Sequence, residues 1–344
     1  MEYKILLKDE KSIQICLREF REEDAAAVVA CIRDEYGSTY LRHNFYDPAT
    51  IIQEQKLGHC KFLVAENDGE IAAVLGMEFP TPPATMCEWI TGIVLKKYRR
   101  LGIMKLLFDM AKQEMLARRD IASGYGFSVT YHDISQRSMG ALGFHPCGFL
   151  LSSLLSMTHS FPKDANWKQH LVIIVCKAGQ ETAGPIYVPA IHEAIAMEIY
   201  RALGVSAQVG TGAAELSGKS VCREEQDEGQ LCCTIWVDES GRDLADCLQA
   251  IEARYTKPLQ TFNVFLNISE AKAVAAYGLL CQKEYFFAGF RPICCDHEIM
   301  VLHKPGKVPI DFTSLVLTEE AGKLRDYVKQ CYEAGGYGGM KDGE

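Results

Sequence analysis

Residues 90–111 constrain the fold of this chain more than any other stretch. The residues from Trp89 to Leu95 are rich in β-branched and aromatic side chains, which favour a buried strand. A basic turn containing Gly102 follows this segment. Apolar residues then recur at intervals of three and four, the spacing of one helical face: Ile103, Leu106, Leu107, Met110 and Ala111. The pattern predicts a strand, a short glycine loop and a helix in direct succession.

A loop of this kind is suited to binding an anion. The first amides of a helix have no partner within the helix, and the helix dipole favours negative charge at that end. Gly102 allows the backbone to approach a ligand closely, and Arg99 and Arg100 add positive charge. Several charge-assisted hydrogen bonds, each worth about 1.5–3 kcal/mol, are sufficient to hold a pyrophosphate.

The element Arg99-x-x-Gly102-x-Met104 resembles the R-x-x-G-x-G/A motif of the GNAT acetyltransferases, which cradles the pyrophosphate of coenzyme A. Residues 18–24 resemble the junction of the first strand and first helix in that family. Gly143-Phe144, followed by Cys147-Gly148-Phe149, resembles the glycine–phenylalanine pair that closes its last helix. The resemblance spans about residues 12–177 and implies an α/β fold, a mixed, mostly antiparallel sheet flanked by helices, with acetyl-CoA as the cofactor.

The resemblance also assigns cofactor-binding positions. A splayed strand of this family presents backbone groups to the pantetheine arm and the thioester, and Gly92, Ile93 and Val94 stand at the matching positions. Gly92 suits close approach of the acetyl group, although it is equally consistent with an ordinary bulge. The remaining cofactor-binding candidates are Arg99, Arg100, Leu101, Gly102, Ile103, Met104, Lys105 and Ser135. Since the family usually has glycine or alanine in place of Met104, we expect this side chain to push the loop outward.

Glu88 is the candidate general base, because it resembles in position the catalytic glutamate of histone-type GNAT enzymes. Four residues at even spacing are expected to share one face of the strand: Glu88, Ile90, Gly92 and Val94. Along an ideal strand Glu88 and Gly92 lie about 13 Å apart, so proton abstraction requires a bulge or a relaying water. A plain carboxylate at the sheet rim is the alternative, and Glu78 on the neighbouring strand is a competing base.

The general acid of the family is replaced here. It is usually a tyrosine four residues before the glycine–phenylalanine pair, and Met139 at that position cannot donate a proton. A thiol leaving group with a pKa near about 8.5 mainly requires charge stabilisation, so catalysis is not excluded. Tyr131, His132 and Ser135 are nearby donors, and His132 takes the place of an asparagine that often contacts the cofactor in the family. An ordinary surface or core role is the alternative for each.

The length and charge of the chain limit its partners. A chain of 344 residues suits two domains, and a net charge of −9 argues against binding to nucleic acid or to an anionic membrane. The first ten residues lack the apolar core of a signal peptide, and no apolar run approaches a membrane span. We therefore expect a cytoplasmic protein whose 14 cysteines are thiols. Cys294-Cys295-Asp296-His297 lacks zinc-ligand spacing, so no metal is predicted.

The chain is predicted to form a GNAT-like domain at residues 1–179 and a second, smaller α/β domain at residues 180–344. Strands are expected in the first domain at 12–20, 61–65, 71–79, 86–95, 125–131, 147–156 and 170–176, with helices at 22–36, after Pro48, after Gly102 and at 134–142. In the second domain, helices are expected at 191–203, 244–255, 269–283 with Ser269 as cap, and 318–332. Strands are expected at 231–237 and 259–267, with a turn at 224–228 and a hairpin at 285–303.

The second domain shows a weak internal repeat. Tyr285-x-x-x-Gly289-Phe290 parallels Phe144-x-x-x-Gly148-Phe149, each after a predicted helix. We expect no phosphate loop in this half, since residues 253–258 stand near the corresponding position without the motif. If the second domain is a GNAT-like copy, it is expected to have lost the cofactor.

The leading hypothesis is an acetyl-CoA-dependent N-acetyltransferase that moves an acetyl group to a small-molecule or peptide amine by direct attack. A non-catalytic acyl-CoA-binding or regulatory tandem module is the alternative, motivated by Met104 and Met139. A duplicated interaction scaffold that binds no nucleotide is a third. The sequence selects neither a particular amine nor an oligomeric state.

Overall fold

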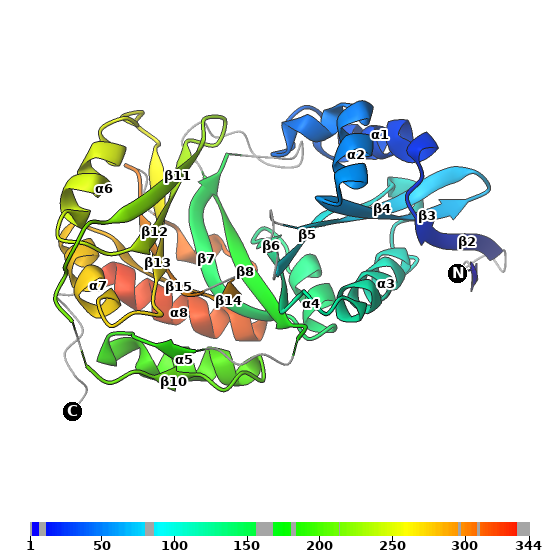
Figure 1. Ribbon diagram of the computed structural model, residues 1–344. Helices are drawn as coiled ribbons and strands as arrows, with labels where there is room; N and C mark the ends of the chain where they lie inside the picture. Colours follow the sequence, from blue (N-terminus) through cyan, green and yellow to red (C-terminus); the bar gives the residue numbers. More distant parts are fainter. Residues whose placement is uncertain are drawn as a thin grey trace. The chain divides into compact units, whose positions relative to one another are not determined.

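The computed structural model describes residues 2–6, 12–79, 86–155, 168–179, 184–212, 214–294, 297–307 and 310–335 (Figure 1). These residues form two compact units, the first ending at Gly126 and the second beginning at Phe127. The predicted domain boundary at residues 179 and 180 stays a prediction. The predicted fold class, a mixed and mostly antiparallel α/β fold, is confirmed. Among the described helices, none has the length and apolar character needed to cross a membrane.

The sheet of the first unit follows chain order. Its strands are β1 (Glu2–Leu6), β2 (Ser12–Glu19), β3 (Cys60–Asn67), β4 (Glu70–Glu78), β5 (Met86–Val94) and β6 (Ser123–Val129), which crosses the boundary of the units. Neighbouring strands are antiparallel except β5 and β6, which are parallel. Asp68 and Gly69 both have positive φ, 48° and 82°, as a tight hairpin turn between β3 and β4 requires.

Helices cover both faces of this sheet (Figure 1). On one face, the short turn η1 (Glu22–Asp24) leads into α1 (Ala25–Tyr36), and η2 (His43–Tyr46) leads into α2 (Pro48–Leu57). The α1 and α2 helices bury a core against β3, β4 and β5 that includes Val28, Ile32, Phe62, Ile90 and Ile93. On the other face lies α3 (Ile103–Ala117), which the turn η3 (Lys96–Tyr98) connects to β5.

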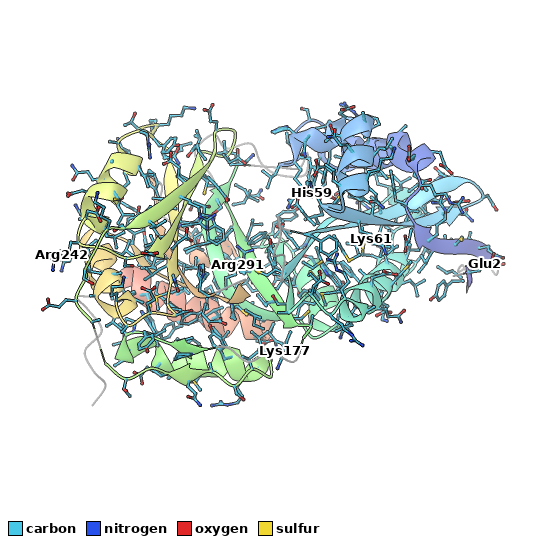
Figure 2. The ribbon with its side chains drawn as sticks, in the orientation of Figure 1. Glu2, His59, Lys61, Lys177, Arg242 and Arg291 are labelled. Atoms are coloured by element: carbon cyan, nitrogen blue, oxygen red, sulfur yellow. The ribbon has the colours of Figure 1, made fainter. Side chains whose placement is uncertain are left out.

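Two ion-pair networks fix the strands of the first unit. Arg18 joins Asp24 and Glu66, with N···O distances of 2.6 Å to each. Burial opposes ionisation of Asp24, but hydrogen bonds from Arg18 and the Arg21 amide prevail and lower its pKa. Lys61, labelled in Figure 2, bonds carboxylates of β2 and α3 at 2.8 and 2.6 Å. The segment that resembles the start of a GNAT domain is thus a structural junction.

The second unit contains a sheet in the order β8-β7-β14-β15-β13-β12-β11. Its elements are α4 (Ile134–Gly140), β7 (His145–Leu154), β8 (Gln169–Lys177), α5 (Ala190–Ala202), β11 (Val221–Asp227), β12 (Cys232–Glu239), α6 (Leu244–Glu252), β13 (Thr261–Asn267), α7 (Ala273–Gln282), β14 (Phe286–Cys294), β15 (His297–Lys304), η4 (Phe312–Ser314) and α8 (Glu319–Glu333). A separate pair is formed by β9 (Pro185–Ile186) and β10 (Gln208–Val209). Arg291 of β14, labelled in Figure 2, lies over the rings of Trp236 and Phe265 at 5.4 and 5.6 Å.

The order of elements in the second unit repeats part of the first. A parallel pair joined by a helix, β12–α6–β13, has the arrangement of β5–α3–β6, and α7 with the β14–β15 hairpin follows as α4 with β7–β8 does. The two glycines of the weak sequence repeat pair with each other, since Gly289 of β14 lies opposite Gly148 of β7. Duplication stays a hypothesis, now with a topological argument in its favour.

Three local predictions for the second half are wrong. Residues 224–227 of the acidic stretch belong to β11, and the turn begins only at Glu228. The α7 helix begins at Ala273, and the Ser269 hydroxyl accepts a hydrogen bond from the Glu298 amide instead of capping it. Residues 253–258 follow α6, so the loop that precedes this helix is 240–243.

The chain itself covers that loop before α6. The Gly241 amide donates to Ser220 Oγ at 2.9 Å, and the Ser220 amide donates to the Asp243 carboxylate at 2.7 Å. A Cβ at Gly241 would lie 2.3 Å from the Lys219 carbonyl carbon. In addition, β12 and β13 stay paired from Cys232–Thr261 to Val237–Leu266. In the described part of the second unit, the loop before α6 is therefore not an open equivalent of the predicted phosphate loop.

Three buried histidines predict that acid destabilises the second unit. Burial lowers the pKa of His170 to about 4 and that of His192 to about 3, and it holds the pKa of His303 well below the ordinary value. Below about pH 6.5, the ordinary pKa of histidine, the unfolded state therefore binds more protons than the folded state, and the free energy of unfolding decreases as the pH falls. Urea unfolding should show a loss of about 2 kcal/mol per histidine between about pH 7.5 and about pH 5. In His192→Asn this pH-dependent loss should be smaller by about a third; an unchanged pH dependence in that variant would contradict the assignment.

Candidate functional site

The N-terminus of α3 is open. Gly102 precedes the helix with φ 76° and has no side chain to cap the first amides. A Cβ at Gly102 would meet no protein atom within 4 Å among the described residues. Within the described structure, the space beside Gly102 at the start of the helix is thus not filled by protein atoms, as an anion site at a helix N-terminus requires. Binding of a ligand by Gly102, Ile103 and the rest of the loop stays a prediction.

The basic residues of this loop differ in what they contact. Arg99 Nε donates to the Val94 carbonyl at 3.0 Å, and its guanidinium pairs with Glu35 of α1. Arg99 therefore braces the loop against β5 and α1, and its charge is compensated. Lys105 pairs with Asp109 at 2.7 Å on the exposed side of α3. Arg100 is exposed, with φ 66°, and has no ion pair within the described part of the chain. Arg100 is therefore the cation most available to a ligand.

Strand β5 contains a bulge at its centre. Ile90 lies opposite Gly76 and Ile93 opposite Val74, so Thr91 and Gly92 together face one residue, Leu75. The predicted common face is therefore wrong: Glu88, Ile90 and Ile93 share a face, whereas Val94, opposite Ala73, lies on the other. The bulge shifts the alternation by one residue. Gly92 itself is exposed.

Two further features surround Gly92. The parallel ladder between β5 and β6 extends only from Met86–Ser123 to Glu88–Tyr125, although both strands continue. The edge of β5 beside Gly92 therefore has no strand partner in the described structure. On the other side, the sulfur of Met104 would lie 3.8 Å from a Cβ at Gly92. The Met104 side chain thus lies between the first turn of α3 and the bulge of β5.

Glu88 lies in a compact polar cluster with Glu78, Arg42 and Tyr125. Glu78 and Glu88 face each other across β4 and β5, where two like charges repel. Arg42 lies between them, with N···O distances of 2.5 Å to Glu78 and 2.9 Å to Glu88. The Tyr125 hydroxyl donates to the second Glu88 oxygen at 2.9 Å. Burial alone lowers the pKa of Arg42, but the two carboxylates outweigh it and raise that pKa. Both oxygens of the Glu88 carboxylate are thus hydrogen-bonded, and its side chain is 12% exposed.

The bulge is tied to the loop that follows α1. Thr91 has φ 52°, a conformation that costs a β-branched residue about 1–3 kcal/mol. Its hydroxyl is 2.7 Å from that of Tyr40, and both residues are buried. Burial raises the pKa of the Tyr40 hydroxyl, so it remains a neutral hydrogen-bonding group. Tyr40 thereby stabilises the strained residue next to Gly92.

The predicted donors after β6 belong to the second unit. The rings of Tyr131 and His132 contact each other, with centroids 4.6 Å apart. His132 Nδ1 and Ser135 Oγ are buried atoms without a hydrogen-bond partner in the described structure. Met139 is buried in α4. The catalytic and cofactor roles of Tyr131, His132 and Ser135 stay predictions.

The prediction that residues 294–297 bind no metal concerns a segment that is only partly described. Cys295 and Asp296 lie outside the described residues. Among the residues that are described, no group of three or more His, Cys, Asp or Glu side chains is placed to hold a metal ion.

Sequence reasoning missed Arg42, Tyr125 and Tyr40. Arg42 and Tyr40 lie in a loop whose composition gives no pattern. One signal was available for Arg42: the hairpin around Asn67-Asp68-Gly69 and the next strand bring Glu78 and Glu88 opposite each other, and such a pair requires a cation. Tyr125 falls within the predicted β6 strand, but only the parallel register places it beside Glu88.

Comparison with known proteins matches one part of the chain to a family. Residues 26–149 match the model of the acetyltransferase (GNAT) family, so the chain contains a GNAT domain. The sequence resemblance is therefore confirmed, and the cofactor of this family is acetyl-CoA. Among curated proteins, none matches the chain.

Solved structures of acetyltransferases are similar to about half of the chain. The ribosomal-protein-S18-alanine N-acetyltransferase of Escherichia coli has 11% identity over 48% of this chain and 96% of its own, with a TM-score of 0.40. A GNAT-family acetyltransferase of Streptococcus pneumoniae has 16% identity over 48% and 99%, with a TM-score of 0.40. The protein yncA of Salmonella typhimurium, solved with its cofactor acetyl-CoA, has 16% identity over 50% and 97%, with a TM-score of 0.40.

Proposed function

We propose that this protein is an acetyl-CoA-dependent N-acetyltransferase that transfers the acetyl group to an amine by direct attack. One observation carries the proposal: the uncapped N-terminus of α3 at Gly102 is open, and it adjoins a bulged strand whose edge is unpaired beside Gly92. The amides of α3 and Arg100 would hold the pyrophosphate, and the edge of β5 would receive the pantetheine arm. The closed α6 loop supports one cofactor site per chain.

Glu88 is the proposed general base for the incoming amine. An amine arrives protonated at neutral pH and must lose a proton before it attacks. Both Glu88 oxygens already accept a hydrogen bond, one from Arg42 and one from Tyr125, so a bridging water is the proposed route for the proton.

A non-catalytic acyl-CoA-binding module is the second candidate. Met139 replaces the usual acid tyrosine and is buried, and Met104 lies beside Gly92 where the family has a smaller residue. Both features favour binding without turnover.

Substitution of Glu88 separates the two functions. For an enzyme, Glu88→Gln should lower kcat by about 100-fold, the usual contribution of a general base, while acetyl-CoA affinity changes by less than about 2-fold. Titration calorimetry with acetyl-CoA and a thiol-release assay over a panel of amines provide the two measurements. Cofactor binding without turnover in the wild type would support the binding module, and absence of cofactor binding would exclude both functions.

A further inference from the structure

The loop between α1 and α2 contacts β5 at two separate points. Tyr40 forms a hydrogen bond with Thr91 at the bulge. Arg42, two residues after Tyr40, donates a hydrogen bond to Glu88, three residues before Thr91. One short loop therefore reaches both the strained residue beside Gly92 and the candidate base.

The loop itself is firmly fixed. The Tyr46 hydroxyl accepts a hydrogen bond from the Tyr40 amide at 2.9 Å, and the rings of Tyr36 and Tyr40 stack with centroids 4.8 Å apart. Phe45 is 1% exposed in the core beneath α1 and α2. A loop anchored in this way can restrain the strand, because Tyr40 and Arg42 are held in place and do not follow movements of β5.

We propose that Tyr40 and Arg42 are positioning residues that clamp the reactive segment of β5, residues 88–92. Tyr40 stabilises the left-handed conformation of Thr91 and so keeps the Gly92 edge exposed to a thioester. Arg42 fixes one oxygen of Glu88 and leaves Tyr125 to fix the other, which sets the direction in which the carboxylate presents its lone pairs. The catalytic consequence rests on the proposed acetyltransferase function, whereas the mechanical consequence does not.

Arg18 provides a matched control for Arg42. Each arginine joins two carboxylates of the first unit, and their side chains are 14% and 24% exposed. Arg18, however, links β2, β3 and η1, and among the described residues it makes no hydrogen bond or ion pair with β5. If only the loss of an ion-pair network matters, substitution of Arg18 and substitution of Arg42 should have similar effects on β5. If the clamp matters, only substitution of Arg42 should affect β5.

Hydrogen–deuterium exchange of the unliganded protein tests the clamp directly. In Arg42→Gln and Tyr40→Phe, amides of the peptide spanning residues 86–95 should exchange at least about 10-fold faster than in the wild type, because their opening free energy falls. Arg18→Gln should leave this peptide unchanged. Equal exchange in all four proteins, or equal acceleration in Arg18→Gln, would overturn the proposal.

A kinetic cycle tests how Arg42 acts. If it positions Glu88, Arg42→Gln should lower kcat by about 10-fold in the wild type but by less than about 2-fold in the Glu88→Gln background. Arg42→Lys, which retains charge without the fork geometry, should recover part of kcat. Independent, multiplicative effects would overturn the positioning role. If Arg42→Gln does not fold, Tyr40→Phe and Arg42→Lys carry the exchange measurement. Acetyl-CoA binding by the wild type decides the proposed function separately.

Discussion

Gly102→Val is expected to weaken acetyl-CoA binding by about 100-fold, close to 2.7 kcal/mol. A Cβ at this position would meet no atom of the described residues within 4 Å, so it would occupy space that solvent or a ligand fills. The residue also has a φ of 76°, which a β-branched side chain tolerates poorly, so the backbone amides before α3 would change direction. Both effects act on the pyrophosphate cradle. Titration calorimetry with acetyl-CoA measures the change in affinity.

Gly58 supplies the control for this substitution. It ends α2 with φ 75°, and a Cβ there would likewise meet no atom within 4 Å. Gly58→Val should therefore lose the same stability as Gly102→Val, about 1–2 kcal/mol, while it retains wild-type affinity for acetyl-CoA. If both variants bound acetyl-CoA with equal affinity, the loop before α3 would not be the phosphate site.

The local sequence was sufficient where short-range chemistry determines the structure. Asn67-Asp68-Gly69 predicts a hairpin, and Asp68 and Gly69 adopt the positive φ that this turn demands. Pro48 and Asp47 predict a helix start, and the Asp47 side chain accepts a hydrogen bond from the Ala49 amide. Gly102 predicts an open loop before a helix, and the structure has one.

The bulge in β5 was not predictable, because its cause lies far away in the sequence. Thr91 has a backbone conformation that its residue type disfavours, and the partner that stabilises it, Tyr40, comes from the loop after α1. Strict alternation of side chains between the two faces of a strand does not account for the extra residue of a bulge. The shared face assigned to Glu88 and Val94 failed for this reason.

The acidic stretch at 224–228 shows a different limit. Its charges suggested a solvated turn, yet residues 224–227 lie in the edge strand β11, and the turn begins at Glu228. Glu224 pairs with Arg254, and the neighbouring Arg223 pairs with Asp238. Charged side chains on an edge strand also discourage pairing with another chain. Composition alone does not separate such a strand from a turn.

Gly289→Ala is expected to destabilise the second unit by more than about 4 kcal/mol, the range reserved for specific structural failures. A Cβ there would lie 2.2 Å from the Gly148 Cα and 2.6 Å from the Cys147 carbonyl oxygen. Both are backbone atoms of β7, so β14 has to separate from β7 to relieve the contact. The φ of 128° adds strain, because side chains rarely adopt it.

A graded series measures how much this contact stabilises the sheet. In Gly148→Ala, the nearest atom is the Phe290 carbonyl oxygen at 3.0 Å, so a smaller loss is expected. Gly278→Ala in α7 meets no atom within 4 Å and should change stability favourably by up to about 1 kcal/mol. Urea unfolding should therefore rank Gly278→Ala first, Gly148→Ala second and Gly289→Ala last. Gly289→Ala with wild-type stability would mean that β7 and β14 are not paired at these glycines, and it would remove the main structural argument that the two sequence repeats meet in one sheet.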